Sequence, residues 1–405
     1  MKAPLLFLLL LLPFLMESTG IQAFSVSLPG VPLSLGGLGF VAFGLANGVM
    51  SKRYSSRFFL AFLLIFLGAL GGAFFSDNLP GNLSAATAQL LFVLAAYGVA
   101  LELCKHNTRL FVMLDVCMAL AFLYWVYYVM DKTLLSGQFI SYTKLTFTRG
   151  PNRAINHHVP GFHISVAAIY LATRLSNYSK ALSYSIVGAS IIGCLLIESR
   201  SNTLFSAFSL MWLIVQHRNL NLWSVLVSAG AVVLIFNLVV GFVGHSDFLS
   251  PRFAAGDYEY QNTTNFSRIY LYQQFLPTFF QHPLGKGLEN PRILYEYTYL
   301  NPHNHYLTFI LAGGMVSLMG VLLFAHTFFQ IIFRVRFQLG RSPVAPYIQP
   351  IKGAALLLFG TLLTIEFGGA IFSLGMVLLL FLEIQYQLQQ QAERKTLLQP
   401  LETTG

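Results

Sequence analysis

The chain has 405 residues, of which 56% are hydrophobic and only 10% are charged. A water-soluble domain of this composition would expose a large apolar surface, so the composition excludes a soluble protein and predicts a polytopic membrane protein. The net charge of +9 comes from single Lys and Arg residues scattered between apolar runs. Because these cations form no basic block, we exclude nucleic acid as a partner and expect membrane lipids around the protein.

Apolar runs that approach the length needed to cross about 30 Å of hydrocarbon follow one another along the chain. They lie at roughly 3–22, 32–50, 58–75, 85–103, 110–130, 159–173, 181–197, 203–216, 222–243, 306–333, 353–366 and 370–388. We therefore predict an all-α fold with about twelve transmembrane helices. The first run resembles a signal peptide but lacks a small-x-small cleavage site, and we interpret it as a retained helix.

The distribution of cations predicts the orientation of these helices, since Lys and Arg near helix ends favour the cytoplasmic side. With the N-terminus inside, the cytoplasmic connections carry Lys52, Arg53, Arg57, Lys105, Arg109, Arg174, Lys180, Arg218, Arg334, Arg336, Arg341 and Lys352. Both termini are then cytoplasmic. Two connections on the opposite side, here called the outward side, are long enough to carry function: 131–158 and 244–302.

Two arginines on the outward side are candidates for binding an anion. Arg200 lies in the polar turn 198–202, where a cation departs from the positive-inside tendency, although a side chain that snorkels to the headgroups would explain it as well. Arg268 precedes the stretch 269–280, whose apolar residues suit a helix lying on the membrane surface. Guanidinium groups stay charged and bind the oxygens of a phosphate or diphosphate in forked geometry.

The segment 282–287, with the sequence His-Pro-Leu-Gly-Lys-Gly, follows this stretch. Its proline should end the helix, and Gly285 and Gly287 permit a tight turn with close approach of the backbone to a ligand. The polar loop ends at Asn301-Pro302-His303-Asn304, directly before a long apolar run. A histidine at this position suits proton transfer near neutral pH, although it could equally be an interfacial residue that caps the helix.

Other polar residues are weaker candidates. Arg153 stands with His157 and His158 at the outward mouth of a helix, where these side chains could contact substrate or cap the helix. Glu366 interrupts an apolar stretch, where a carboxylate is costly, and we interpret it as the mark of an outward hairpin. Asp257 and Glu259 could bind a divalent ion, but an exposed polar loop is the simpler explanation, and Cys104, Cys117 and Cys194 lack metal-ligand spacing. We predict no metal site.

The region of about 180–330 resembles the bacterial O-antigen ligases and the related O-antigen polymerases. The ligase signature is His, then Asn, Ser or Gln, nine residues, Gly, two residues, and Gly, Thr or Tyr. Here His303 and Asn304 are followed by nine residues and Gly314, and the last position departs from the signature with Ser317. The segment from Arg268 through 283–287 resembles the arginine and Pro-Leu-x-Gly-x-Gly pattern of the family. The tripeptide Ser199-Arg200-Ser201 resembles its Ser-Arg turn.

This resemblance implies a multi-helix membrane glycosyltransferase of the GT-C-like type in the bacterial inner membrane, inverting and metal-independent, with its active site facing the periplasm. It would transfer a glycan from undecaprenyl diphosphate to lipid A-core in lipopolysaccharide biosynthesis. His303 would activate the acceptor hydroxyl or orient the donor, and Arg200 and Arg268 would bind the diphosphate. Residues Asn304, Gly285, Gly287, Gly314 and Arg153 would support the site. The diphosphate is a good leaving group, so no cofactor is expected, and the sequence has no Walker-type loop.

The predicted organisation is nine helices in 1–243, a large periplasmic loop with amphipathic helices in 244–305, three helices in 306–388 and a cytoplasmic tail in 389–405. Three other functions stay open. A polymerase or a protein O-oligosaccharyltransferase would use the same lipid-linked donor. A secondary transporter would also have about twelve helices and isolated charges, but here the charges gather in the outward loop and the two halves show no repeat.

Overall fold

A computed structural model describes residues 35–50, 56–105, 108–131, 147–148, 154–155, 158–197, 200–218, 258–288, 293–295, 298–300, 304–335, 337, 342–362 and 370–402. This part of the chain is almost entirely helical, which confirms the predicted helical fold class. Two small antiparallel hairpins were not predicted. They pair Phe147–Thr148 (β1) with Ala154–Ile155 (β2), and Ile293–Tyr295 (β3) with Thr298–Leu300 (β4).

The helices coincide with ten of the twelve predicted apolar runs, since the runs 3–22 and 222–243 lie outside the described residues. They are α3 (Leu35–Met50), α4 (Arg57–Ala73), α5 (Leu79–Cys104), α6 (Thr108–Met130), α7 (His158–Leu175), α8 (Lys180–Leu196), α9 (Arg200–Arg218), α12 (His305–Phe329), α13 (Ala345–Thr361) and α14 (Ala370–Glu402). A π-helical turn, η4 (Gln330–Arg334), extends α12. A further helix, α11 (Tyr258–Gln281), begins before the predicted stretch 269–280 and ends before Pro283, as predicted.

Three helical segments of the described chain are long and apolar enough to cross a membrane: Leu79–Cys104, Arg109–Met130 and His305–Arg334. The chain is therefore a membrane protein. The count of twelve spans and the region boundaries at 243, 305 and 388 stay predictions.

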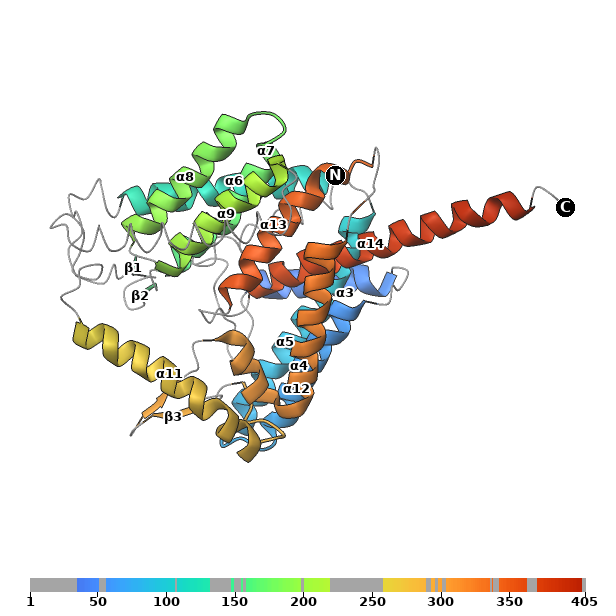
Figure 1. Ribbon diagram of the computed structural model, residues 1–405. Coiled ribbons are helices and arrows are strands. Elements are labelled where there is room, and N and C mark those ends of the chain that lie inside the picture. The colour runs from blue at the N-terminus through green and yellow to red at the C-terminus, as the bar shows by residue number, and fades with distance from the viewer. Residues whose placement is uncertain are drawn as a thin grey trace.

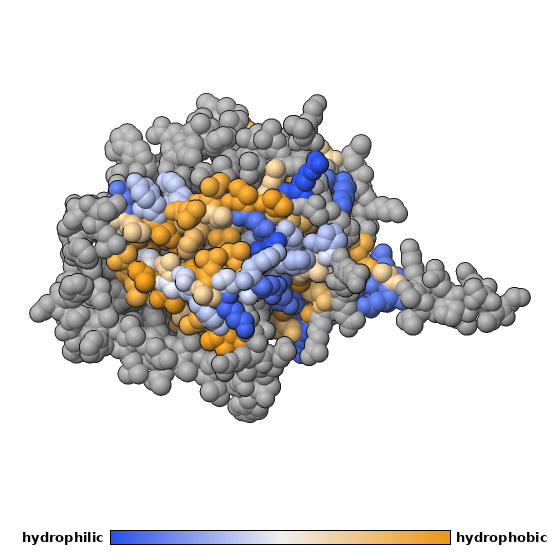
Figure 2. Space-filling model, turned by 90° about the horizontal axis from the view of Figure 1, so that it is seen from above, coloured by the Kyte–Doolittle hydropathy of each residue, from blue (hydrophilic) through white to orange (hydrophobic). Residues whose placement is uncertain are grey.

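The helices form two groups that α13 and α14 connect. In Figure 1, α3, α4, α5 and α12 pack side by side in the lower half, whereas α6, α7, α8 and α9 form the upper group. Helix α13 contacts α7 and α9 of the upper group, and α14 contacts α4 and α5 of the lower one. The C-terminal end of α14 projects away from both groups (Figure 1). Viewed from above, apolar side chains cover much of the described surface with hydrophilic ones between them, and hydrophilic side chains lie at the base of this projection (Figure 2).

Aromatic rings fill the centre of the lower group. Phe62 of α4 lies 5.6 Å from Phe324 of α12 and 5.7 Å from Phe372 of α14, measured between ring centroids. Phe66, one turn further along α4, meets Phe309 edge-on at 5.3 Å. Such pairs each contribute about 0.5–1.5 kcal/mol beyond the burial of their area, so they fix α4, α12 and α14 relative to one another.

Small residues allow α4 and α12 to approach closely. A Cβ atom on Gly68 would lie 2.8 Å from the carbonyl oxygen of Gly313, and one on Gly320 would lie 2.7 Å from that of Ala61. Ser317 belongs to the same contact, where its buried hydroxyl donates a hydrogen bond of 2.6 Å to the Ile65 carbonyl. The serine that departs from the ligase signature therefore serves helix packing, as small and hydroxyl residues commonly do between membrane helices.

Two buried charged residues stabilise the other end of the lower group. The Glu383 carboxylate of α14 accepts hydrogen bonds from the Arg57 and Phe58 amides at 2.8 and 3.0 Å, so it caps the start of α4 from a different helix. Lys352 donates to the Ile332 and Val335 carbonyls at 3.1 and 2.8 Å, where the π-helical turn leaves acceptors at the end of α12. Each buried charge thus has the hydrogen bonds that compensate its loss of water.

The helix ends that are predicted to be cytoplasmic gather on one side. Arg57 at the start of α4 donates to Gln330 at the end of α12 (3.1 Å), and Arg174 at the end of α7 pairs with Asp115 near the start of α6 (3.3 Å). These pairs join the start of one helix to the end of another, as expected if successive helices cross a membrane in opposite directions.

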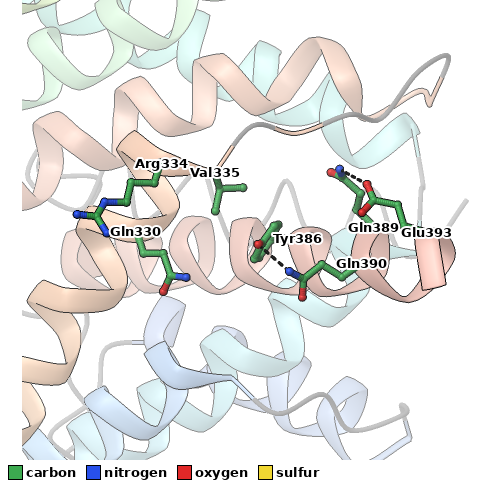
Figure 3. A pocket seen from close by; sticks show the side chains of 7 residues that line it. All are labelled: Gln330, Arg334, Val335, Tyr386, Gln389, Gln390 and Glu393. Atoms are coloured by element: carbon green, nitrogen blue, oxygen red, sulfur yellow. Dashed lines mark hydrogen bonds between the residues drawn. The ribbon is translucent and has the colours of Figure 1, made fainter. Parts of the chain in front are cut away.

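An open cleft of about 320 Å³ lies on the same side, between η4 and α14. Its lining residues are Gln330, Arg334, Val335, Tyr386, Gln389, Gln390 and Glu393 (Figure 3).

Cysteine labelling tests this orientation, because the three native cysteines are buried. A cysteine replacing the exposed Gln281 should react with an impermeant maleimide in intact spheroplasts, whereas one replacing the exposed Ala392 should react only after the membrane is permeabilised. The reverse pattern would invert the predicted topology.

Candidate functional site

The centre of the side that is predicted to face outward is a break in α12. Gly314 has φ +59° and ψ −143°, a conformation outside the helical region, so the helix stops and restarts at this residue. The segment 282–287 between α11 and β3 lies against the break. Three of the predicted site residues, Gly285, Gly287 and Gly314, therefore come together although about thirty positions separate them in the sequence.

Backbone hydrogen bonds between the loop and α12 replace bonds that the broken helix cannot make. The Met315 amide donates to the Pro283 carbonyl at 2.8 Å, whereas in an unbroken helix it would donate to Leu311. The carbonyls of Leu311 and Ala312 instead accept from the Lys286 and Gly287 amides at 3.0 and 2.9 Å. We call this set of three hydrogen bonds the clasp. It satisfies donors and acceptors that would be costly to leave unpaired inside a membrane protein.

The surroundings of the three glycines at the clasp, Gly285, Gly287 and Gly314, leave no room for a side chain. Gly285 and Gly287 have φ of +92° and +81°, where L residues are strained. A Cβ atom would lie 2.2 Å from the Ala312 oxygen at Gly285, 2.4 Å from the Asn82 side chain at Gly287, and 2.0 Å from the Pro283 oxygen at Gly314. The sequence predicted close approach of the loop backbone to a ligand. In the structure, the loop backbone instead closely approaches α12 and α5.

The hairpin between α4 and α5 completes the clasp, and the sequence analysis did not assign it to the site. A Cβ atom on Gly72 would lie 2.1 Å from the Ala312 oxygen. Asn82 is fully buried against Gly287, and its amide donates to the Ser76 hydroxyl and the Asn78 carbonyl at 3.0 and 2.9 Å. The spacing of Gly68 and Gly72, four residues apart in an apolar helix, is the sequence signal that could have indicated this close contact.

Asn304 fixes the start of α12. Its side chain accepts from the Tyr306 and Leu307 amides at 3.1 and 3.2 Å, which makes it the N-cap residue. The amide of His305, the residue that directly follows Asn304, donates to the Leu362 carbonyl at the end of α13 (2.9 Å). The backbone that directly follows His303 is thus held by both its own helix and α13. His303 lies outside the described residues.

Two basic residues of the loop, His282 and Lys286, lie near each other, and Lys286 also lies near Asp77 of the α4–α5 hairpin. Partial desolvation, with the positive charge of Lys286, lowers the pKa of His282. Partial burial also lowers the pKa of Lys286, an effect that the Asp77 carboxylate opposes. A histidine whose pKa is lowered from 6.5 is mostly uncharged at neutral pH, so Lys286 carries the positive charge of this loop.

A network of buried hydroxyl groups fixes the start of α9, whose first residue is Arg200. Ser206 of α9 lies 2.6 Å from the Ser165 hydroxyl of α7 and 2.8 Å from the Ser190 hydroxyl of α8. Ser165 also donates to the Gly161 carbonyl (2.7 Å). Polar side chains of this kind join helices in an apolar environment, so the network holds the first half of α9 against α7 and α8.

The remaining predicted residues are only partly placed. Arg268 lies in the middle of α11, and the side chains of Arg200 and Arg268 are outside the described part, as are Arg153, His157 and Glu366. Asp257 is also outside it, together with the Glu259 side chain. Among the residues that the structure does describe, no group of three or more His, Cys, Asp or Glu side chains could bind a metal ion.

Comparison with known proteins identifies one part of the chain. Residues 185–324 match the family model described as O-antigen ligase. The matched part begins in α8 and extends through α9, α11 and the clasp to Phe324 of α12, so it contains Arg200, Arg268, His303, Asn304 and all three glycines. No curated protein matches the chain.

Alanine substitutions at glycine test the clasp. Gly314→Ala should lower the thermal stability of the purified protein, because a non-glycine residue in such a conformation costs about 1–3 kcal/mol before the contact with Pro283 is counted. Gly72→Ala should also lower the thermal stability, because its Cβ atom would collide with the Ala312 oxygen. Gly71→Ala is the matched control in the same helix, since nothing lies within 4 Å of its Cβ position. Equal melting temperatures for all three variants would contradict the close approach.

Proposed function

Because residues 185–324 match the family model described as O-antigen ligase, we propose that the chain is an O-antigen ligase. It would transfer a glycan from undecaprenyl diphosphate to lipid A-core at the periplasmic face of the bacterial inner membrane. The observation that carries this proposal is the extent of the family match, which covers both arginines, the clasp and the start of α12 together.

The arginines would bind the diphosphate of the donor. Arg200 at the first position of α9 and Arg268 in α11 come from two helices within the matched region. Guanidinium groups remain charged and present forked donors to phosphate oxygens, which suits a leaving group whose negative charge grows during the reaction. The arginines would then supply the electrostatic stabilisation that a divalent cation supplies elsewhere, and the enzyme would need no metal.

His303 would act as general base. An acceptor hydroxyl of the lipid A-core sugar attacks the anomeric carbon of the donor from the face opposite the diphosphate. The bond between that carbon and the diphosphate oxygen breaks, and the hydroxyl proton passes to His303. The anomeric configuration is inverted in this single displacement. Asn304 contributes by fixing the backbone next to the histidine, through its capping of α12.

A polymerase is the second candidate, because ligases and polymerases share the lipid-linked donor and Ser317 departs from the ligase signature. Deletion of the gene separates the two. Loss of a ligase should leave polymerised, lipid-linked glycan together with lipopolysaccharide that lacks long chains. Lipid A-core bearing a single repeat unit would show instead that ligation is intact and that the protein is the polymerase.

Arginine substitutions test the binding of the diphosphate. Arg200→Ala and Arg268→Ala should each reduce glycan transfer strongly, since one charged hydrogen bond contributes about 1.5–3 kcal/mol. Lysine should restore transfer only in part, because it lacks the forked donors. Lys180→Ala, at an exposed residue of α8, is the matched control and should transfer normally. Normal transfer by both arginine variants, at equal amounts in the membrane, would remove the proposed anchors.

Substitutions of His303 distinguish a base from a positioning group. General base catalysis contributes about a hundredfold to ten-thousandfold, so His303→Ala should nearly abolish transfer in complemented deletion strains. His303→Gln should restore little, because glutamine forms hydrogen bonds but does not accept the proton. Full activity of His303→Gln would assign the histidine a positioning role instead.

A further inference from the structure

Helix α11 exposes a stripe of large apolar side chains. Tyr272, Leu276, Phe280 and, in the loop beyond the helix, Leu284 follow one another at intervals of four residues. Their exposed fractions are 43%, 56%, 71% and 57%. Four neighbouring side chains of this size, three on one helix and one in the loop that follows it, exceed the scattered apolar residues that are normal on a protein surface.

The stripe adjoins a second apolar face of α11 that is covered. Leu271 and Phe279 are buried against Ile293, Ile310 and Leu311, and Phe275 is partly buried there. At 100° per residue, the exposed stripe lies directly beside this buried face, and the exposed Gln273 lies beyond the stripe. The apolar side of α11 is therefore about twice as wide as the protein contact that covers it, which leaves half of it for another apolar environment.

Exposed apolar residues of the α4–α5 hairpin continue the stripe. Phe74, Phe75 and Leu79 are exposed at the outward end of α4 and the start of α5. The hairpin touches the loop after α11, since a Cβ atom on Gly72 would lie 3.2 Å from the carbonyl carbon of Gly285. We call the seven residues Tyr272, Leu276, Phe280, Leu284, Phe74, Phe75 and Leu79 the collar.

We propose that the collar is a docking surface for the outward leaflet of the bilayer, into which α11 inserts its stripe. The occupant is lipid and not a second protein, because the collar adjoins α4 and α5, which also expose Leu60, Leu67 and Leu94, and α5 is long and apolar enough to cross the membrane. Aromatic residues are typical of the boundary between hydrocarbon and headgroups. The collar also lies beside His282 and Lys286, and the Lys286 amine suits lipid phosphate.

The contact of the collar with lipid is independent of the reaction at the proposed active site. It places Pro283, Gly285 and Gly287 of the clasp at the level of the lipid headgroups, between the stripe of α11 and the α4–α5 hairpin. The surface helix predicted from residues 269–280 thus gains a defined lipid-facing side and a defined protein-facing side.

Spin labels on single cysteines test the collar. The native cysteines are buried, so labels at Leu276→Cys and Phe280→Cys report selectively on the stripe, and Gln273→Cys and Gln281→Cys are controls on the same helix. With the full-length protein in nanodiscs, the stripe labels should collide more often with oxygen than with a water-soluble nickel chelate, and the two control labels should show the opposite preference.

Two results would overturn the proposal. Stripe labels that collide with the nickel chelate as often as the control labels do would show that the stripe faces water. Stripe labels that are immobilised and protected from both reagents would show that protein covers the stripe.

Discussion

The clasp between the loop 283–287 and the break in α12 is the interaction on which the outward side of the structure depends. A helix that is interrupted inside a membrane protein leaves backbone donors and acceptors without partners, and each such group costs several kcal/mol when no water reaches it. The loop supplies the missing partners through three backbone hydrogen bonds: the Pro283 carbonyl accepts one, and the Lys286 and Gly287 amides donate the other two. Because only the backbone takes part, the requirement on the sequence is for glycine and not for particular polar side chains.

The clasp joins α11 to the closely packed pair of α4 and α12. It ties the end of α11 to α12, and through Gly72 and Asn82 it ties both to the α4–α5 hairpin. At the other end of the first half of α12, Asn304 and the carbonyl of Leu362 hold the helix start. The proposed base directly precedes Asn304 in the sequence, and one proposed anion-binding arginine, Arg268, belongs to α11. Sites of this kind need their groups held within a fraction of an ångström, and a rigid connection between the elements provides it.

The sequence allowed most of the described helices and the glycine loop to be predicted, but not the reason for these glycines. Apolar runs locate most helices because each membrane-spanning helix must satisfy its backbone internally and present apolar side chains. The loop at 282–287 and the signature from His303 to Gly314 were likewise visible as patterns. The contact between these two segments was not visible in the sequence, since a backbone hydrogen bond such as that between Lys286 and Leu311 leaves no trace in composition or spacing. For the same reason Gly72, Asn82 and the packing role of Ser317 appear only in three dimensions.

Hydrogen exchange of the purified protein tests the clasp most directly. The amides of Lys286, Gly287 and Met315 donate to carbonyls across the break, so peptides covering 283–288 should exchange as slowly as those from the helical part of α12. In Gly314→Ala the same peptides should lose this protection while peptides from α7 keep theirs. Rapid exchange of residues 283–288 in the unmodified protein, at the rate of an exposed loop, would contradict the account.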